Sequence, residues 1–146
     1  MQALLTSVYF TDPSVRGTMI KSPIELIVGT LRSFNYYSFD PKTGVQYARR
    51  LGQDLFDPPN VKGWRGGKTW INTNTLLIRR GFLNRLTRGN AMKDLKYGLF
   101  ESSTGIKSRE ECAAETLLPV KVFITPAPKF NQTLRTILQH PLYQLK

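Results

Sequence analysis

The residues best suited to bind a ligand lie between Lys62 and Trp70, a segment that contains glycines, cationic side chains and two tryptophans. Gly67-Lys68-Thr69 matches the end of a phosphate-binding loop, in which backbone N–H groups and a lysine hold nucleotide phosphates. That motif needs a glycine at position 62, which is Lys62 here, and Pro58 and Pro59 stand where a buried strand must precede it. The segment therefore does not predict a nucleoside triphosphate site.

The same segment contains a basic and aromatic cluster. Its cations are Lys62, Arg65 and Lys68, and its indoles are Trp64 and Trp70. In a functional interpretation, the indoles stack on a base or a sugar ring while the cations hold phosphate or carboxylate groups. In a structural interpretation, the tryptophans anchor the loop on the helices and the cations point to water. We favour the structural interpretation, because two indoles seldom remain fully in water.

The charge pattern extends this cluster along the chain. Lys and Arg number 21 against 10 Asp and Glu, a formal net charge of +11, and no carboxylate occurs between Asp57 and Asp94. Bases in that stretch either face solvent, pair at long range, or attract phosphate polymers or anionic lipid headgroups. The candidate residues for an anionic partner are Lys62, Arg65, Lys68, Arg79 and Arg80.

The sequence offers little for catalysis or for metal binding. His140 is the one histidine, Cys112 is the one cysteine, and Asp54 and Asp57 are neighbouring carboxylates with no sign of perturbation. A hydrolytic triad or a His-rich or Cys-rich metal site built by this chain is not predicted. Catalytic residues stay unknown, and neither a metal nor a cofactor is expected.

Several segments around the cluster predict helices. Ser22-Pro23-Ile24-Glu25 has the form of a capping box with proline at the first position, so a helix should start at Pro23. Apolar spacing predicts further helices over Val45–Phe56 and from Asn72 or Thr73 to Leu86. Arg79 falls within the apolar arc of the latter and needs a carboxylate or backbone carbonyl as partner.

Shorter elements are expected towards both ends of the chain. The pattern predicts helices over residues 1–10, 91–100, 108–118 and 131–139, and a short extended segment near 120–124. No apolar run approaches the roughly 20 residues that cross a bilayer, and residues 1–10 do not have the form of a signal peptide. The sequence therefore predicts a mainly α-helical single domain over residues 1–146, with an ordered Gly/Pro/Trp loop over 57–70 sealing part of its core.

Three long runs are similar to a known bacterial family. Residues 20–32, residues 51–64 with the following Gly66-Gly67 and Trp70-Ile71-Asn72-Thr73, and residues 140–146 resemble the C-terminal part of the family called domain of unknown function 1800. The resemblance implies a larger, mostly helical parent protein without an assigned activity. It also implies that this chain is a C-terminal fragment, and that export is expected by analogy with family members.

Three functional hypotheses follow. The leading one is a binding or assembly module whose basic loop and following helix meet an anionic partner, which is the N-terminal part of the parent protein, another protein or a polyanion. A second hypothesis is that the chain completes an enzyme active site together with that N-terminal part. The third is direct nucleic-acid binding, for which no helix-turn-helix spacing is present.

Overall fold

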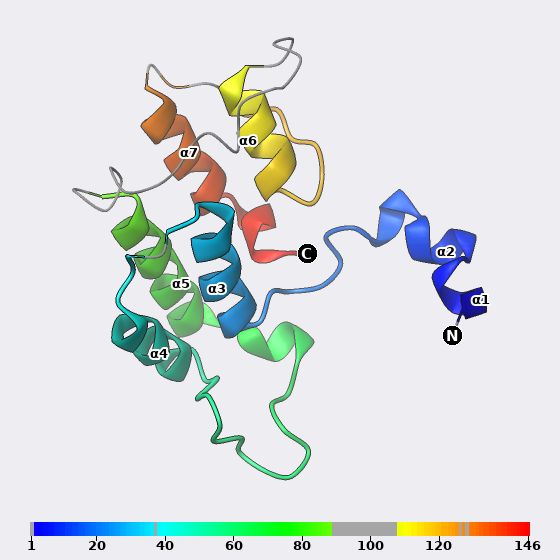
Figure 1. Cartoon of the computed structure of the whole chain (residues 1–146), viewed down its shortest axis with the longest axis vertical. Coiled ribbons are helices and arrows are strands. Elements are labelled where there is room, and N and C mark those ends of the chain that lie inside the picture. The colour runs from blue at the N-terminus through cyan, green and yellow to red at the C-terminus, as the bar shows by residue number, and fades with distance from the viewer. Residues whose placement is uncertain (1, 37, 89–107, 126, 128) are drawn as a thin grey trace.

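A computed structural model describes residues 2–36, 38–88, 108–125, 127 and 129–146. The prediction of a mainly α-helical single-domain fold is confirmed. In spatial order, α6 packs on α7, α7 on α5, α5 on α4 and α4 on α3 (Figure 1). The bounds of these helices are Pro23–Ser33 for α3, Pro41–Arg50 for α4, Thr73–Leu86 for α5, Arg109–Leu117 for α6 and Phe130–Gln139 for α7.

Two helices of the bundle begin where the sequence predicts, because reciprocal side-chain caps satisfy their first N–H groups. At α3, the Glu25 N–H donates to Ser22 Oγ at 3.3 Å and the Ser22 N–H donates to Glu25 Oε2 at 2.8 Å. At α5, the Thr75 N–H donates to Asn72 Oδ1 and the Asn72 N–H donates to Thr75 Oγ1, both at 2.8 Å. The predicted starts of both helices are therefore confirmed.

Helix α4 is shifted from the predicted range Val45–Phe56 towards the N-terminus and begins at Pro41. Asp40 caps it, since the carboxylate accepts the N–H groups of Lys42 and Thr43 at 3.1 and 3.0 Å. Proline at the first helical position needs no N–H partner and already has a helical φ. The Asp-Pro dipeptide is thus a helix start, four residues before the predicted start at Val45.

The same helix ends at Arg50, six residues before the predicted end at Phe56. Gly52 adopts φ +86°, and the Gln53 N–H turns back to the Ala48 carbonyl at 3.0 Å. A left-handed glycine just past the last turn is a common helix stop, because it has no Cβ to clash. Asp54, which follows this helix stop, pairs with Arg49 at 2.5 Å from Nε to Oδ2.

The N-terminal segment forms two short helices, α1 (Gln2–Leu5) and α2 (Val8–Thr11), in place of the single helix predicted over residues 1–10. Ser7 between them has extended backbone angles. Both helices lie away from the bundle (Figure 1), and Val8 and Tyr9 are largely exposed. Helices of this length are marginally stable without tertiary packing. In the described structure α1 and α2 lie apart from the bundle and gain little from it (Figure 1).

The C-terminal end lies beside the segment that precedes α3. The 3-10 helix η5 (Pro141–Gln144) follows α7, and its last residues meet residues 19–21. The Lys21 N–H donates to the Gln144 carbonyl and the Lys146 N–H donates to the Met19 carbonyl, each at 2.8 Å, and Ile20 and Leu145 form an antiparallel bridge. These bonds join the two ends of the folded bundle.

Residues 120–124 form no strand, although an extended segment was predicted there. Val122 and Ile124 pack against the core, while Phe123 between them is fully exposed. This alternation is that of extended backbone, but no neighbouring strand supplies a hydrogen-bonded ladder. The predicted helix over 91–100 lies outside the described residues.

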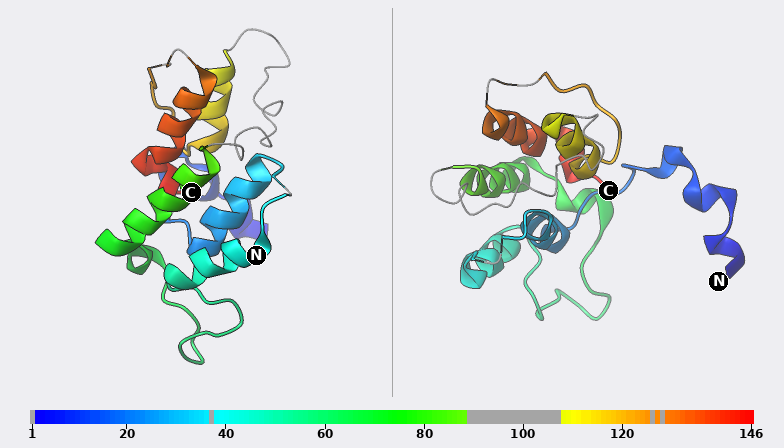
Figure 2. Two further views of the ribbon diagram at one scale, coloured as in Figure 1. Left: turned by 90° about the vertical axis from the view of Figure 1, so that its left-hand side faces the viewer. Right: turned by 45° about the horizontal axis from the view of Figure 1, so that its top comes forward.

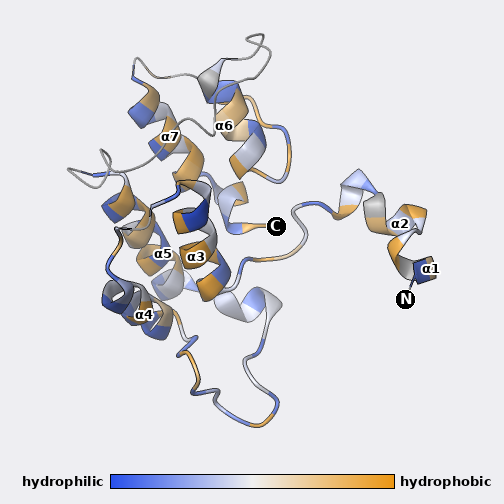
Figure 3. Ribbon diagram, in the orientation of Figure 1, coloured by the Kyte–Doolittle hydropathy of each residue, from blue (hydrophilic) through white to orange (hydrophobic). Residues whose placement is uncertain are grey.

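Phe82 on α5 is completely buried in the core cluster. Each helix of the bundle carries both hydrophobic and hydrophilic residues along its ribbon (Figure 3). The Phe82 ring makes edge contacts with Tyr47, at 5.3 Å between centroids, and with Phe39, at 6.0 Å. Such pairs add to the gain from burying apolar area. The core also contains Leu26, Ile27, Phe34, Ala48, Leu51, Leu83, Leu86, Ala113, Leu117, Leu118, Leu134, Ile137, Leu138 and Tyr143.

We expect Phe82→Ala to lower the free energy of unfolding by about 3 to 5 kcal/mol, because it removes a wholly buried ring and leaves a cavity. The matched control is Leu77→Ala on the same helix, where the side chain is 65% exposed and the change should stay within about 0.5 kcal/mol. Urea unfolding followed by circular dichroism measures both. Equal losses in the two variants would contradict this position of the core.

Candidate anion-binding surface

A loop between α4 and α5 extends beyond the helical bundle and carries most of the predicted cluster (Figure 2). We call residues 56–66 the projecting loop. At its turn, the Lys62 N–H donates to Asn60 Oδ1 and the Gly63 N–H donates to the Asn60 carbonyl, both at 2.9 Å. Gly63 has φ +78°, a conformation that favours glycine. The turn places Val61 and Lys62 at its corner, where both are exposed.

The loop returns to the bundle through the 3-10 helix η2 (Gly67–Trp70). Thr69 Oγ1 bonds the carbonyls of Arg65 and Gly66 at 2.8 and 3.0 Å. Trp70 is buried, and its carbonyl accepts a hydrogen bond from Thr75 Oγ1 at 3.1 Å. The returning arm is therefore ordered by local bonds and is attached to the start of α5.

The structure does not support the expectation that the loop seals the core. Trp70 lies outside the main cluster of core residues, and Trp64 is half-buried. The Trp64 Nε1 is buried without a hydrogen-bond partner in the described part of the chain. Because the loop makes its bonds mainly within itself, it projects from the bundle and does not cover it.

Three of the predicted cations, Lys62, Arg65 and Lys68, are exposed on the projecting loop and the adjoining η2. Within the described ranges, none of the three forms an ion pair with a carboxylate. Arg80 on α5 is also exposed, but its Nε donates to Gln139 Oε1 of α7 at 3.1 Å. The loop therefore presents three cations whose charge is not compensated by a described ion pair.

The carboxylates nearest in sequence to the loop cations, Asp54 and Asp57, interact with Arg49. Asp54 bonds Arg49 and is the main cause that raises the pKa of that guanidinium, with a smaller contribution from the field of Asp57. Both Arg49 and Arg50 lie at the end of α4, before the loop. The positive charge of the projecting loop is thus left open to solvent.

Arg79 differs from the other candidates, because its side chain is entirely buried. Its Nη2 donates to the Lys21 carbonyl at 2.8 Å and its Nη1 donates to Gln144 Oε1 at 3.2 Å, so the predicted carbonyl partner is confirmed. Burial lowers the pKa of Arg79 to about 10. The prediction that Arg79 meets an external anion is wrong, since its donors face the interior.

Lys21 is a second inward-facing cation, which the sequence analysis did not identify. Its Nζ donates to the Tyr143 carbonyl at 2.8 Å and lies 4.0 Å from the centroid of the Tyr143 ring, a cation–π contact. Burial lowers the pKa of Lys21 to about 8; Glu25 opposes that effect and Arg79 adds to it. The Tyr143 hydroxyl is 2.7 Å from Thr30 Oγ1, and burial raises its pKa to about 12.

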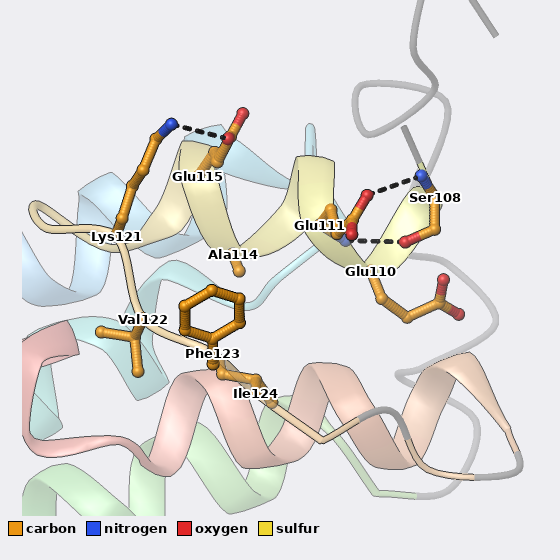
Figure 4. A pocket seen from close by; sticks show the side chains of 9 residues that line it. All are labelled: Ser108, Glu110, Glu111, Ala114, Glu115, Lys121, Val122, Phe123 and Ile124. Atoms are coloured by element: carbon orange, nitrogen blue, oxygen red, sulfur yellow. Dashed lines mark hydrogen bonds and ion pairs between the residues drawn. The ribbon is translucent and has the colours of Figure 1, made fainter. Parts of the chain in front are cut away.

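Two of the cavities in the described structure are lined by residues outside the projecting loop. One, of about 320 Å³, is an apolar groove between α3 and α4, with Val28, Val45 and Leu55 among its lining residues. The other, of about 380 Å³, lies between α6 and residues 121–124 (Figure 4). Two of its carboxylates interact with neighbours: Glu111 accepts the Ser108 N–H at 3.1 Å, and Glu115 is 3.8 Å from Lys121 Nζ.

Residues with metal-binding or acid–base capacity are scattered. Across the described ranges, no group of three or more His, Cys, Asp or Glu side chains comes together. His140 ends α7, and its Nδ1 accepts the Leu142 N–H at 3.2 Å. Among the described helices, none has the length and apolar content required to span a bilayer.

Fold and site together define a small, basic, mainly helical domain with a cationic loop. Residues 1–145 match the family described as protein of unknown function DUF1800, and the chain belongs to that family. No curated protein and no solved structure matches it. The family assignment covers essentially the whole chain, including the segments in which the sequence resemblance was weak.

The lowered pKa of Lys21 predicts that the free energy of unfolding rises with pH in the alkaline range. Below about pH 8 both states hold the proton, and the folded state carries the cost of the buried charge. Between pH 8 and the ordinary pKa of 10.5 the unfolded chain binds more protons, so the free energy of unfolding increases with pH. Urea unfolding across this range should show a steeper rise for the native protein than for Lys21→Met, and parallel curves would contradict the assignment.

Proposed function

We propose that this protein is a binding or assembly module that meets an anionic partner through the cations of the projecting loop and η2. The observation that carries this proposal is the exposure of Lys62, Arg65 and Lys68 without ion pairs among the described residues. An uncompensated cluster on a projecting element attracts anions over a Debye length and releases condensed counterions on contact with a polyanion. Arg80 adds charge on the neighbouring helix.

The ordered backbone of the loop supports this function. The turn at Asn60–Gly63 and the Thr69 bonds hold the cations on a defined scaffold, which reduces the ordering cost of binding. The nearest carboxylates, Asp54 and Asp57, act on Arg49. A partner anion therefore does not have to displace an internal ion pair from the three loop cations.

The other two hypotheses stay predictions. Completion of an enzyme active site with another part of a parent protein would require a catalytic group in this chain that faces that part. Nucleic-acid binding would use the same cations, and its signature is a steep dependence of affinity on salt. These two hypotheses differ from the leading proposal in the partner that they require, which is the other part of a parent protein in the first and a nucleic acid in the second.

The test is retention on heparin, with the three loop cations replaced together as Lys62→Gln, Arg65→Gln and Lys68→Gln. We expect the variant to elute at clearly lower salt, and the slope of log affinity against log salt to fall by about one for each lost contact, as for phosphate polymers. The matched control removes the same charge elsewhere, at exposed bases on other elements, as Arg16→Gln, Lys42→Gln and Lys129→Gln.

Equal loss of retention in both triple variants would reduce the effect to net charge and refute a specific role for the loop. Arg79 is left unchanged in this design. Its replacement would disturb the bonds to Lys21 and Gln144 and would report on folding.

A further inference from the structure

The projecting loop exposes large apolar side chains as well as cations. Phe56 is 95% exposed, and Val61 at the turn is fully exposed. Single exposed apolar residues are common on protein surfaces, but here they coincide with a basic cluster on an element that extends beyond the bundle (Figure 1). This combination indicates a contact with a partner that is both apolar and anionic.

The backbone holds these side chains outward. Phe56 has φ +67°, a left-handed conformation that is rare for a bulky residue. Val61 lies within the Asn60–Gly63 turn, whose bonds are formed by Asn60. Pro58 and Pro59 between them restrict the chain further by fixing their own φ angles. The exposure of Phe56 and Val61 thus comes from an ordered turn.

An anionic lipid surface has the chemistry that this arrangement matches. Each Lys or Arg near such a surface strengthens binding by about fivefold, and each apolar side chain that leaves water adds about tenfold. Binding at such a surface grows with the apolar area that is buried and with the electrostatic attraction to anionic lipids. Lys62, Arg65 and Lys68 provide the attraction, and Phe56 and Val61 provide the apolar area.

We propose that the projecting loop contacts the surface of an anionic membrane, with Phe56 and Val61 entering the interfacial layer and the loop cations binding headgroup phosphates. This inference rests on the proposed function, because it identifies the anionic partner as lipid. The loop attaches the domain to one face of the bilayer. The helical bundle stays outside the lipid.

Two other classes of partner fit the loop less well. Single-stranded nucleic acids gain from stacking on aromatic faces. Phe56 presents one such face, but Trp64 is half-buried and Val61 at the corner of the turn is aliphatic. A stable protein interface usually buries about 800 Å² on each partner across a packed surface. Phe56 and Val61 lie on a single projecting loop, which is suited to insertion into a soft surface.

The experiment measures flotation of the whole chain with vesicles of phosphatidylcholine alone or mixed with phosphatidylglycerol. We expect binding to the mixed vesicles, weakened by salt, and little binding to phosphatidylcholine. The double variant Phe56→Gln, Val61→Gln should lose at least tenfold in vesicle affinity while keeping its retention on heparin. The triple variant that removes the loop cations should lose both.

The control is Phe123→Gln with Leu77→Gln, which replaces exposed apolar side chains on other elements. It should bind mixed vesicles like the native protein. Brominated lipids provide a second measurement, because both tryptophans lie at or beside the loop and Trp64 is within it. Membrane contact through the loop should quench their fluorescence, and the Phe56→Gln, Val61→Gln variant should lose the quenching.

The outcomes separate the two proposals. Heparin retention without vesicle binding would overturn the membrane inference and leave the anion-binding function standing, as would preferential binding to single-stranded nucleic acid or to an acidic protein. Vesicle binding that is unaffected by Phe56→Gln, Val61→Gln, or that proceeds without quenching, would also overturn it. Failure of the loop cations to affect either ligand would refute the proposed function itself.

Discussion

The buried guanidinium of Arg79 joins three parts of the chain that are distant in sequence. It extends from α5 to the carbonyl of Lys21, before α3, and to the side chain of Gln144 in η5. An arginine in a low-dielectric interior is costly unless its donors are satisfied. The two Nη atoms have these acceptors, while Nε is buried without a hydrogen-bond partner among the described residues, so the two acceptors must stay in place. The bonds between residues 19–21 and 144–146 hold them there. The ends of the bundle and its central helix thus depend on one another.

Lys21 adds a second cation to the same region, and its amine is satisfied by a backbone carbonyl and the face of Tyr143. Neither interior cation bonds a carboxylate among the described residues, because Glu25 bonds Lys146 instead. Positive charge is therefore tolerated inside by carbonyl dipoles and a ring, while other described bases such as Lys62, Arg65 and Lys68 lie at the surface. The chain, whose net charge is +11, therefore has cations that stabilise the fold and cations that are exposed to solvent.

Three of the surface cations, Lys62, Arg65 and Lys68, lie where the chain leaves the helical bundle. Helix α4 ends at Arg50, earlier than its apolar pattern predicted, and residues 56–66 project from the bundle before Trp70 is buried again (Figure 2). Local bonds at Asn60 and Thr69 order the intervening chain without covering the core. The loop therefore exposes cations and apolar side chains together, in an arrangement suited to contact with a partner.

Helix starts at Pro23 and Thr73 were predictable from sequence, because a capping box is a local interaction among neighbouring residues. The family and the helical class followed from long motifs and from periodicity. The direction of the projecting loop and the roles of Arg79 and Lys21 were decided only by tertiary structure. Whether a cation faces water or a distant carbonyl depends on contacts between residues far apart in the chain, and the spacing of neighbours carries no information about them.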